Sequence, residues 1–174
     1  MMNRFGIVLA ACALAGCGSS GFDQSKVKAL IEEQPVKLES EQVALTQGIV
    51  DCGVQNELWE APTQVSTDRS VAKLTDKGRA LKFSDDVSIG DAPQPYVQVR
   101  GDLPLQVDDV PSITDVDANT KRADVKAGVK IDQACFPGPL PIMGVKKGNF
   151  NASVPPAFRF TFDGSSWHLD RLVH

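Results

Sequence analysis

Hydrophobic positions recur with the spacing of an α-helix near the start of the chain. Val27, Leu30 and Ile31 fall on one stripe of a predicted helix over residues 25–34, which a proline ends. A second helix is predicted over residues 40–47, because a serine can cap its start and a glycine can end it. The early part of the chain is therefore expected to be helical.

Later in the chain, hydrophobic and polar residues alternate as they do in β-strands. The predicted strands and hairpins are residues 49–54, 71–74 with 80–83, 96–100, 113–118 with 123–131, and 158–162 with 167–173. The last hairpin has the strongest pattern, since Phe158, Phe160 and Phe162 alternate with polar residues before a Gly-Ser turn. We expect this phenylalanine stripe to lie in the core.

Two turn signals and the acidic residues complete the outline of the fold. Gly78 can adopt a positive φ in the predicted turn over residues 75–78, and prolines favour an extended loop over residues 135–141. Every glutamate occurs at or before Glu60, whereas aspartate, which favours caps and turns, supplies every later acid. The sequence therefore predicts an α+β domain, with one or two N-terminal helices packed on an antiparallel β-sheet of hairpins.

The first 16 residues have the pattern of an export signal. Arg4 precedes an apolar run over residues 5–14, and the small residues Ala15 and Gly16 follow, as a signal peptidase requires beside its cut. As a helix, the apolar run would rise only ~15 Å, which is too short for a hydrocarbon core of ~30 Å. A transmembrane helix is therefore not expected here.

The run LAGC, which ends at Cys17, closely resembles the lipobox of bacterial lipoproteins. The resemblance covers about the first two dozen residues. It implies that the Cys17 thiol receives a diacylglycerol, that residues 1–16 are then removed, and that the new amine is acylated. Gly18 follows the cysteine, where an aspartate often marks inner-membrane retention, so the resemblance implies the periplasmic face of the outer membrane. The alternative is an ordinary secretory signal that happens to contain a cysteine.

This interpretation divides the chain into a signal peptide over residues 1–16, a lipidated flexible tether over residues 17–24 and one periplasmic domain over residues 25–174. The tether is rich in glycine and serine. Two or more acyl chains would hold the protein firmly at the membrane, since one chain alone gives only marginal binding.

Two cysteines remain once Cys12 has left with the signal and Cys17 carries lipid. Cys52 and Cys135 are expected to form a disulfide in an oxidising compartment. The alternative is that either cysteine serves as a nucleophile or a metal ligand. The chain has no Cys-x-x-Cys motif and only two histidines, which favours the disulfide.

The charge balance argues against nucleic acid as a partner. Lysine and arginine number 18 against 22 acidic residues, and the longest basic runs are pairs such as Lys121-Arg122. No cofactor is predicted.

Two short motifs could carry chemistry, and both have simpler explanations. His168 and Asp170 would point to the same side of the last strand and could orient an imidazole, but that side is expected to face solvent. The run from Asp115 to Asn119 begins like a calcium loop, yet the sixth position is a threonine and the twelfth a lysine, where an EF-hand has glycine and glutamate. We therefore predict no catalytic residue and no metal site.

The function expected from the sequence is that of a lipid-anchored, non-enzymatic binding or assembly module of the cell envelope, with a protein partner. One alternative is an inhibitor or immunity lipoprotein that blocks an envelope-degrading toxin, using a protruding loop such as residues 137–141. The other is an envelope hydrolase with a dispersed active site, which would place an acidic pair in a deep pocket.

Overall fold

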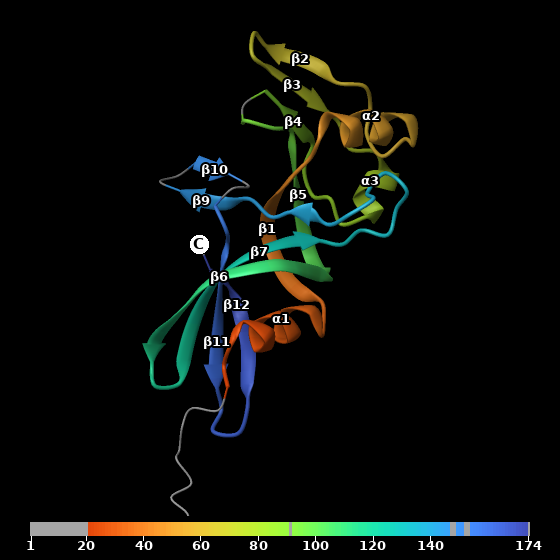
Figure 1. Ribbon diagram of the computed structural model, residues 1–174. Coiled ribbons are helices and arrows are strands. Elements are labelled where there is room, and N and C mark those ends of the chain that lie inside the picture. Colours follow the sequence, from red (N-terminus) through yellow and green to blue (C-terminus); the bar gives the residue numbers. More distant parts are fainter. Residues whose placement is uncertain (1–20, 91, 147–148, 152–153, 174) are drawn as a thin grey trace, which may run out of the picture.

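The computed structural model describes residues 21–90, 92–146, 149–151 and 154–173, and about half of these residues lie in antiparallel β-strands (Figure 1). Cys17, the predicted site of lipid attachment, lies outside the described residues. The helices are α1 (Gln24–Glu32), α2 (Gln47–Gln55) and α3 (Asp76–Ala80). The strands are β1 (Val36–Ala44), β2 (Thr63–Ser66), β3 (Arg69–Ala72), β4 (Val87–Ile89), β5 (Tyr96–Leu103), β6 (Leu105–Asp117), β7 (Thr120–Val129), β8 (Leu140–Pro141), β9 (Gly144–Lys146), β10 (Asn149–Asn151), β11 (Ala157–Phe162) and β12 (Trp167–Val173).

The strands form two main sheets. The N-terminal sheet has the order β1-β5-β4-β3-β2, and the C-terminal sheet has the order β12-β11-β7-β6, with β8 added on β7. Among the described residues, strands β9 and β10 form a separate two-stranded ladder. Pro104 alone separates β5 from β6, so the chain passes from one sheet into the other without a loop.

The hairpins near the end of the chain are confirmed. β6 pairs with β7 and β11 pairs with β12, as the alternation predicts. Phe158 and Phe160 are fully buried, which confirms that they belong to the core. Helix α1 also lies where the sequence predicts it, and its stripe of Val27, Leu30 and Ile31 is buried against the C-terminal sheet.

The second predicted helix, over residues 40–47, is wrong. This segment belongs mainly to β1, which pairs along its length with β5. A β-bulge between Leu38 and Glu41 interrupts the alternation of buried and exposed residues, and the strand pattern is therefore hidden in the sequence.

The predicted strand over residues 49–54 is also wrong, because these residues lie in α2. Thr46 caps this helix, and its side-chain oxygen accepts a hydrogen bond from the Ile49 backbone N–H. Val50 and Gly53 are the residues that α2 buries. Gly53 is needed for space, since a Cβ there would lie 2.0 Å from the Trp59 ring.

The hairpin predicted for residues 71–74 and 80–83 does not form. β3 pairs instead with β2 and β4, and Thr75 caps the short helix α3. Gly78 lies inside α3 rather than in a turn, and a Cβ there would approach the Leu58 carbonyl oxygen to 2.1 Å. The predicted α+β class is thus confirmed only in part: the fold is rich in antiparallel β-sheet and contains few helices.

The predicted disulfide is present and joins α2 to the segment before β8. The Cα atoms of Cys52 and Cys135 are 5.6 Å apart, and 83 positions separate them in the chain. The Asn56 side-chain amide donates a hydrogen bond to the Cys52 carbonyl (2.9 Å). Next to the bridge, Phe136 packs edge-on to Phe83 at 5.7 Å between ring centroids. This bridge therefore ties the second half of the chain to the N-terminal sheet.

Candidate binding site

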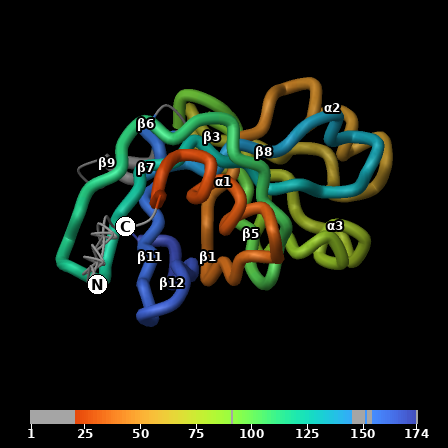
Figure 2. Tube along the Cα trace, turned by 60° about the horizontal axis from the view of Figure 1, so that its bottom comes forward, coloured from red at the N-terminus to blue at the C-terminus, as the bar shows by residue number. Residues whose placement is uncertain are grey.

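A groove lies between the free edges of the two sheets. β1 and β12 are each the last strand of their sheet, and they lie beside each other (Figure 2). No backbone pairing joins these two strands, all of whose residues are described. The groove between them has a volume of about 390 Å³; one wall is formed by residues 34–37 with Glu39 and Glu41, and the other by residues 169–172.

The open part of β1 is its first half. Farther along the strand, the Met143 backbone N–H donates to the Gln42 carbonyl oxygen (2.8 Å), and Val43 forms a bridge with Ile142. These contacts cover the outer edge of β1 at residues 42–43. Over residues 36–40 no described backbone group forms such a bond on that side. The Glu39 carbonyl oxygen accepts a hydrogen bond from the Arg100 side chain (2.8 Å), so the other backbone groups of this stretch are the ones that present strand-edge hydrogen bonds to the groove.

The side chains of the groove carry both signs of charge. Lys37 and Glu39 are exposed on the β1 wall, and Arg171 is exposed on the β12 wall. Glu41 also lines the groove but is only 3% exposed, because the bulge in β1 places it opposite the fully buried Val99. The groove therefore has a buried carboxylate at depth and exposed charged side chains at its rim.

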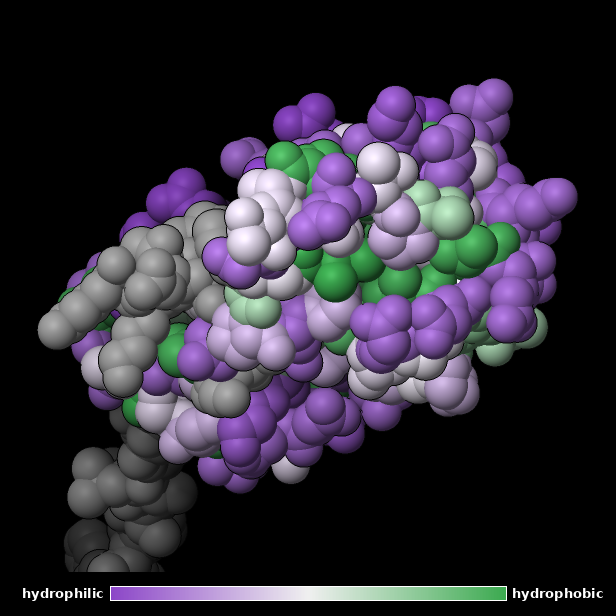
Figure 3. All heavy atoms as spheres, turned by 90° about the horizontal axis from the view of Figure 1, so that it is seen from above, coloured by the Kyte–Doolittle hydropathy of each residue, from purple (hydrophilic) through white to green (hydrophobic). Residues whose placement is uncertain are grey.

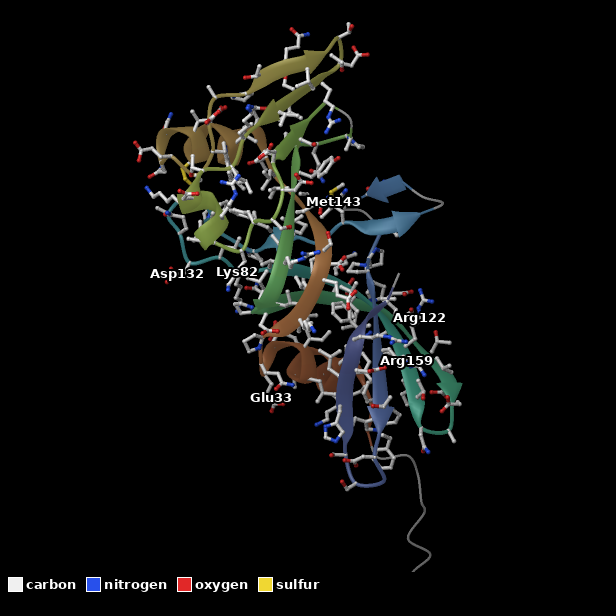
Figure 4. All side chains as sticks on the ribbon, turned by 180° about the vertical axis from the view of Figure 1, so that it is seen from behind. Glu33, Lys82, Arg122, Asp132, Met143 and Arg159 are labelled. Carbon is white, nitrogen blue, oxygen red and sulfur yellow. A yellow bond between two sulfur atoms is a disulfide. The ribbon has the colours of Figure 1, made fainter. Side chains whose placement is uncertain are left out.

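Arginines from three neighbouring strands lead up to the β12 wall. Arg159 on β11 lies directly opposite Arg122 on β7 and Arg171 on β12. Arg122 and Arg159 are labelled side by side in Figure 4. Like charges placed opposite one another on adjacent strands are unfavourable. Two carboxylates offset them: Asp124 lies 3.8 Å from Arg122, and Asp170 lies 3.6 Å from Arg159.

The third arginine of this row, Arg171, has a different environment. Among the described residues, its side chain forms no hydrogen bond or ion pair, and it is the one that lines the groove. The Nε atom of Arg159 is buried without a hydrogen-bond partner but lies 3.6 Å from the Asp170 carboxylate. Arg171 is therefore the member of the row whose donors face the groove.

His168 and Asp170 both lie at the surface, but they do not pair with each other. The extra residue of a β-bulge in β12 is Asp170, which turns toward Arg159. The His168 Nε2 atom lies 2.8 Å from the Asp163 carboxylate instead. Backbone N–H groups of Ser166 and Ser165 donate to that carboxylate and lower the pKa of Asp163. This cluster serves to close the β11–β12 turn.

The acidic run at the β6–β7 turn is likewise engaged by its own neighbours. The Asn119 backbone N–H donates to the Asp117 carboxylate (2.9 Å) and lowers its pKa, while Asp115 pairs with Lys121. Within the described ranges, no group of three or more histidine, cysteine or acidic residues is placed to hold a metal ion.

The proline-rich segment packs against the domain. Leu140 is 1% exposed, and β8 pairs with β7. Gly128 is needed here, since a Cβ at this position would lie 2.8 Å from the Pro139 Cβ. The prolines therefore stiffen a segment that is held down beside the disulfide.

No family model matches this chain, and no curated protein or solved structure matches it significantly. Over the part of the chain that the structure describes, no helix has the length and hydropathy required to cross a membrane. The groove must therefore be interpreted from its own residues.

Proposed function

We propose that the protein is a lipoprotein anchored through Cys17 at the periplasmic face of the outer membrane, and that it acts there as a non-enzymatic binding or assembly module. Its folded domain holds an extended segment of a protein partner in the groove between β1 and β12. The observation that carries the proposal is that two adjacent, unpaired strand edges line one groove.

Strand edges bind extended peptides through their main-chain groups. Each unpaired edge offers a row of N–H and C=O groups to an added strand, and side chains beside the edge select the sequence that is added. Here residues 36–40 provide such an edge, and Lys37, Glu39 and Arg171 provide charges of both signs. A segment with mixed charges is the complementary occupant.

Seen from the side of β2 and β3, the molecule is mostly polar, with a strip of apolar side chains bordered by polar ones (Figure 3). Among the described residues, the large hydrophobic side chains that are exposed are Val65 and Val116. The proposal therefore rests on the groove and not on an apolar surface patch.

Photo-crosslinking in intact cells tests the groove. A benzoylphenylalanine at position 37, on the groove wall, is expected to give one dominant protein adduct. The same probe at position 73 is the control, because Lys73 is also exposed but does not line the groove. Adducts of equal yield at both positions, or none at position 37, would contradict the proposal.

A charge-reversal pair shows whether the groove itself recognises the captured partner. Arg171→Glu is expected to weaken binding of the purified partner roughly tenfold, equivalent to ~1.4 kcal/mol. Arg122→Glu is the matched control, since Arg122 belongs to the same arginine row but lies outside the groove. The groove is not the binding site if the two variants lose affinity equally.

The anchor has its own test. Intact mass measurement of protein from the native host is expected to show a chain that begins at Cys17 and carries acyl groups. Cys17→Ala is expected to move the protein from the membrane fraction to the soluble fraction. A retained leader, or a processed chain without acyl mass, would contradict the anchoring.

A further inference from the structure

The point at which the chain enters the fold is fixed by an aromatic contact. The Phe22 ring packs 4.6 Å from Trp167 and 5.1 Å from Phe160, measured between ring centroids. The ammonium group of Lys121 lies 5.9 Å from the same ring. Asp23 then caps α1 by accepting a hydrogen bond from the Lys26 N–H (2.9 Å). Phe22 is thus held beside the first residue of β12.

Cys17 precedes Phe22 by only five residues. A fully extended chain spans at most ~3.6 Å per residue, so a lipid on Cys17 cannot lie more than ~18 Å from Phe22. The end of the domain that carries Phe22 must therefore stay close to the bilayer surface. This step rests on the anchoring proposed above.

The β6–β7 turn lies at the same end as Phe22. The Phe162 backbone N–H donates to the Asn119 carbonyl oxygen (2.8 Å), which ties the β6–β7 turn to the β11–β12 hairpin. Val116 lies in this β6–β7 turn region at a shift of the strand register, and it is 57% exposed. An exposed apolar side chain thus lies close to where the membrane must be.

We infer that this end of the domain faces the lipid surface, with Val116 in contact with the bilayer interface. The opposite end, with β2 and β3, then points into the periplasm (Figure 1). Asp115 and Asp117 flank Val116, and Lys121 is paired with Asp115. The charges beside Val116 therefore do not attract anionic headgroups, and the covalent anchor holds the contact. The contact is therefore expected to persist at high salt.

The chain contains a matched pair of positions for the test. Val116 and Val65 are each 57% exposed, but Val65 lies on β2 at the opposite end. Val116→Cys and Val65→Cys variants of the full, lipidated chain are labelled with an environment-sensitive fluorophore. They are then reconstituted into vesicles of phosphatidylethanolamine and phosphatidylglycerol, with and without brominated acyl chains. Intact mass confirms acylation and the Cys52–Cys135 bridge in each sample.

Brominated lipid is expected to quench the probe at position 116 at least twofold more than the probe at position 65. Equal quenching at the two positions of an acylated chain, or stronger quenching at position 65, would overturn the orientation and leave the anchor standing. A chain without acyl mass would overturn both the orientation and the anchor.

Lengthening the tether separates the short spacing from other causes of the contact. Ten glycine and serine residues inserted before Gly21 leave Cys17 and the folded domain unchanged. Quenching at position 116 is then expected to fall toward that at position 65. Unchanged quenching would overturn the short tether as the cause of the orientation.

Discussion

The two sheets are held together by different means. In the N-terminal sheet, a disulfide between positions 83 residues apart ties α2 to the segment that carries Phe136. The strands of neither sheet contain a cysteine, and the C-terminal sheet depends on aromatic packing, with Phe160 and Trp167 covered by Phe22. One sheet is therefore sensitive to redox conditions, whereas the other depends on a residue next to the proposed anchor.

Removal of the disulfide is expected to have the largest effect. In the chain-entropy model, a bridge that closes a loop of this length stabilises the fold by ~4–5 kcal/mol. The Cys52→Ser, Cys135→Ser double variant is expected to lose about that much free energy of unfolding, measured by urea denaturation. Amide exchange is expected to accelerate more in α2 than in β11. Equal acceleration in both elements would show that the two sheets are not stabilised separately.

The matching change in the C-terminal sheet is Phe160→Ala. A fully buried phenylalanine typically contributes ~3–5 kcal/mol when truncated, and Phe160 has no exposed surface. In the Phe160→Ala variant, amide exchange is expected to accelerate more in β11 and β12 than in α2, which is the reverse of the pattern expected for the disulfide variant. A variant that unfolds α2 first would contradict the comparison.

Removing a helix cap beside either sheet is expected to have a smaller effect on stability. Thr46 caps α2 beside the N-terminal sheet, and Asp23 caps α1 against the C-terminal sheet. Replacing either by alanine is expected to cost ~1 kcal/mol in the free energy of unfolding, measured by thermal denaturation. The Thr46→Ala variant is expected to leave the amide-exchange protection of α1 unchanged. Loss of α1 protection in that variant would argue against separate stabilisation.

The smallest expected effect concerns the stability of the fold at low pH. Hydrogen bonds from Ser166 and Ser165 lower the pKa of Asp163 in the folded state below its unfolded value. Its contribution to stability is therefore present above the unfolded pKa, ~3.9, and is lost as the pH falls through the folded value. In Asp163→Asn, the melting temperature is expected to fall less steeply below pH 4 than in the unchanged chain. An equally steep fall would contradict this role for Asp163.

Local patterns predicted the C-terminal sheet better than the N-terminal sheet. Strands β11 and β12 are neighbours in the chain, so their alternation and turn could be predicted directly. β1 pairs with β5 some sixty residues later, and its bulge removes the alternation that would have identified it as a strand. The disulfide could be predicted because only Cys52 and Cys135 remained to pair.

The groove could not be predicted from the sequence. It depends on two strand edges that are distant in the chain and on the bulge that buries Glu41. The alignment of Arg122, Arg159 and Arg171 depends on strand register, which shifts at Asp170. The periodicity of one strand does not show which residue of a distant strand it faces, or that the edges of two sheets meet.

The disulfide also determines what happens when the backbone is cut. The β2–β3 hairpin, whose residues on β2 are all exposed, lies between Cys52 and Cys135. A single cleavage there yields two pieces that remain covalently joined, and they migrate apart only after reduction. A protease that cuts this exposed hairpin therefore cannot release either fragment from the other.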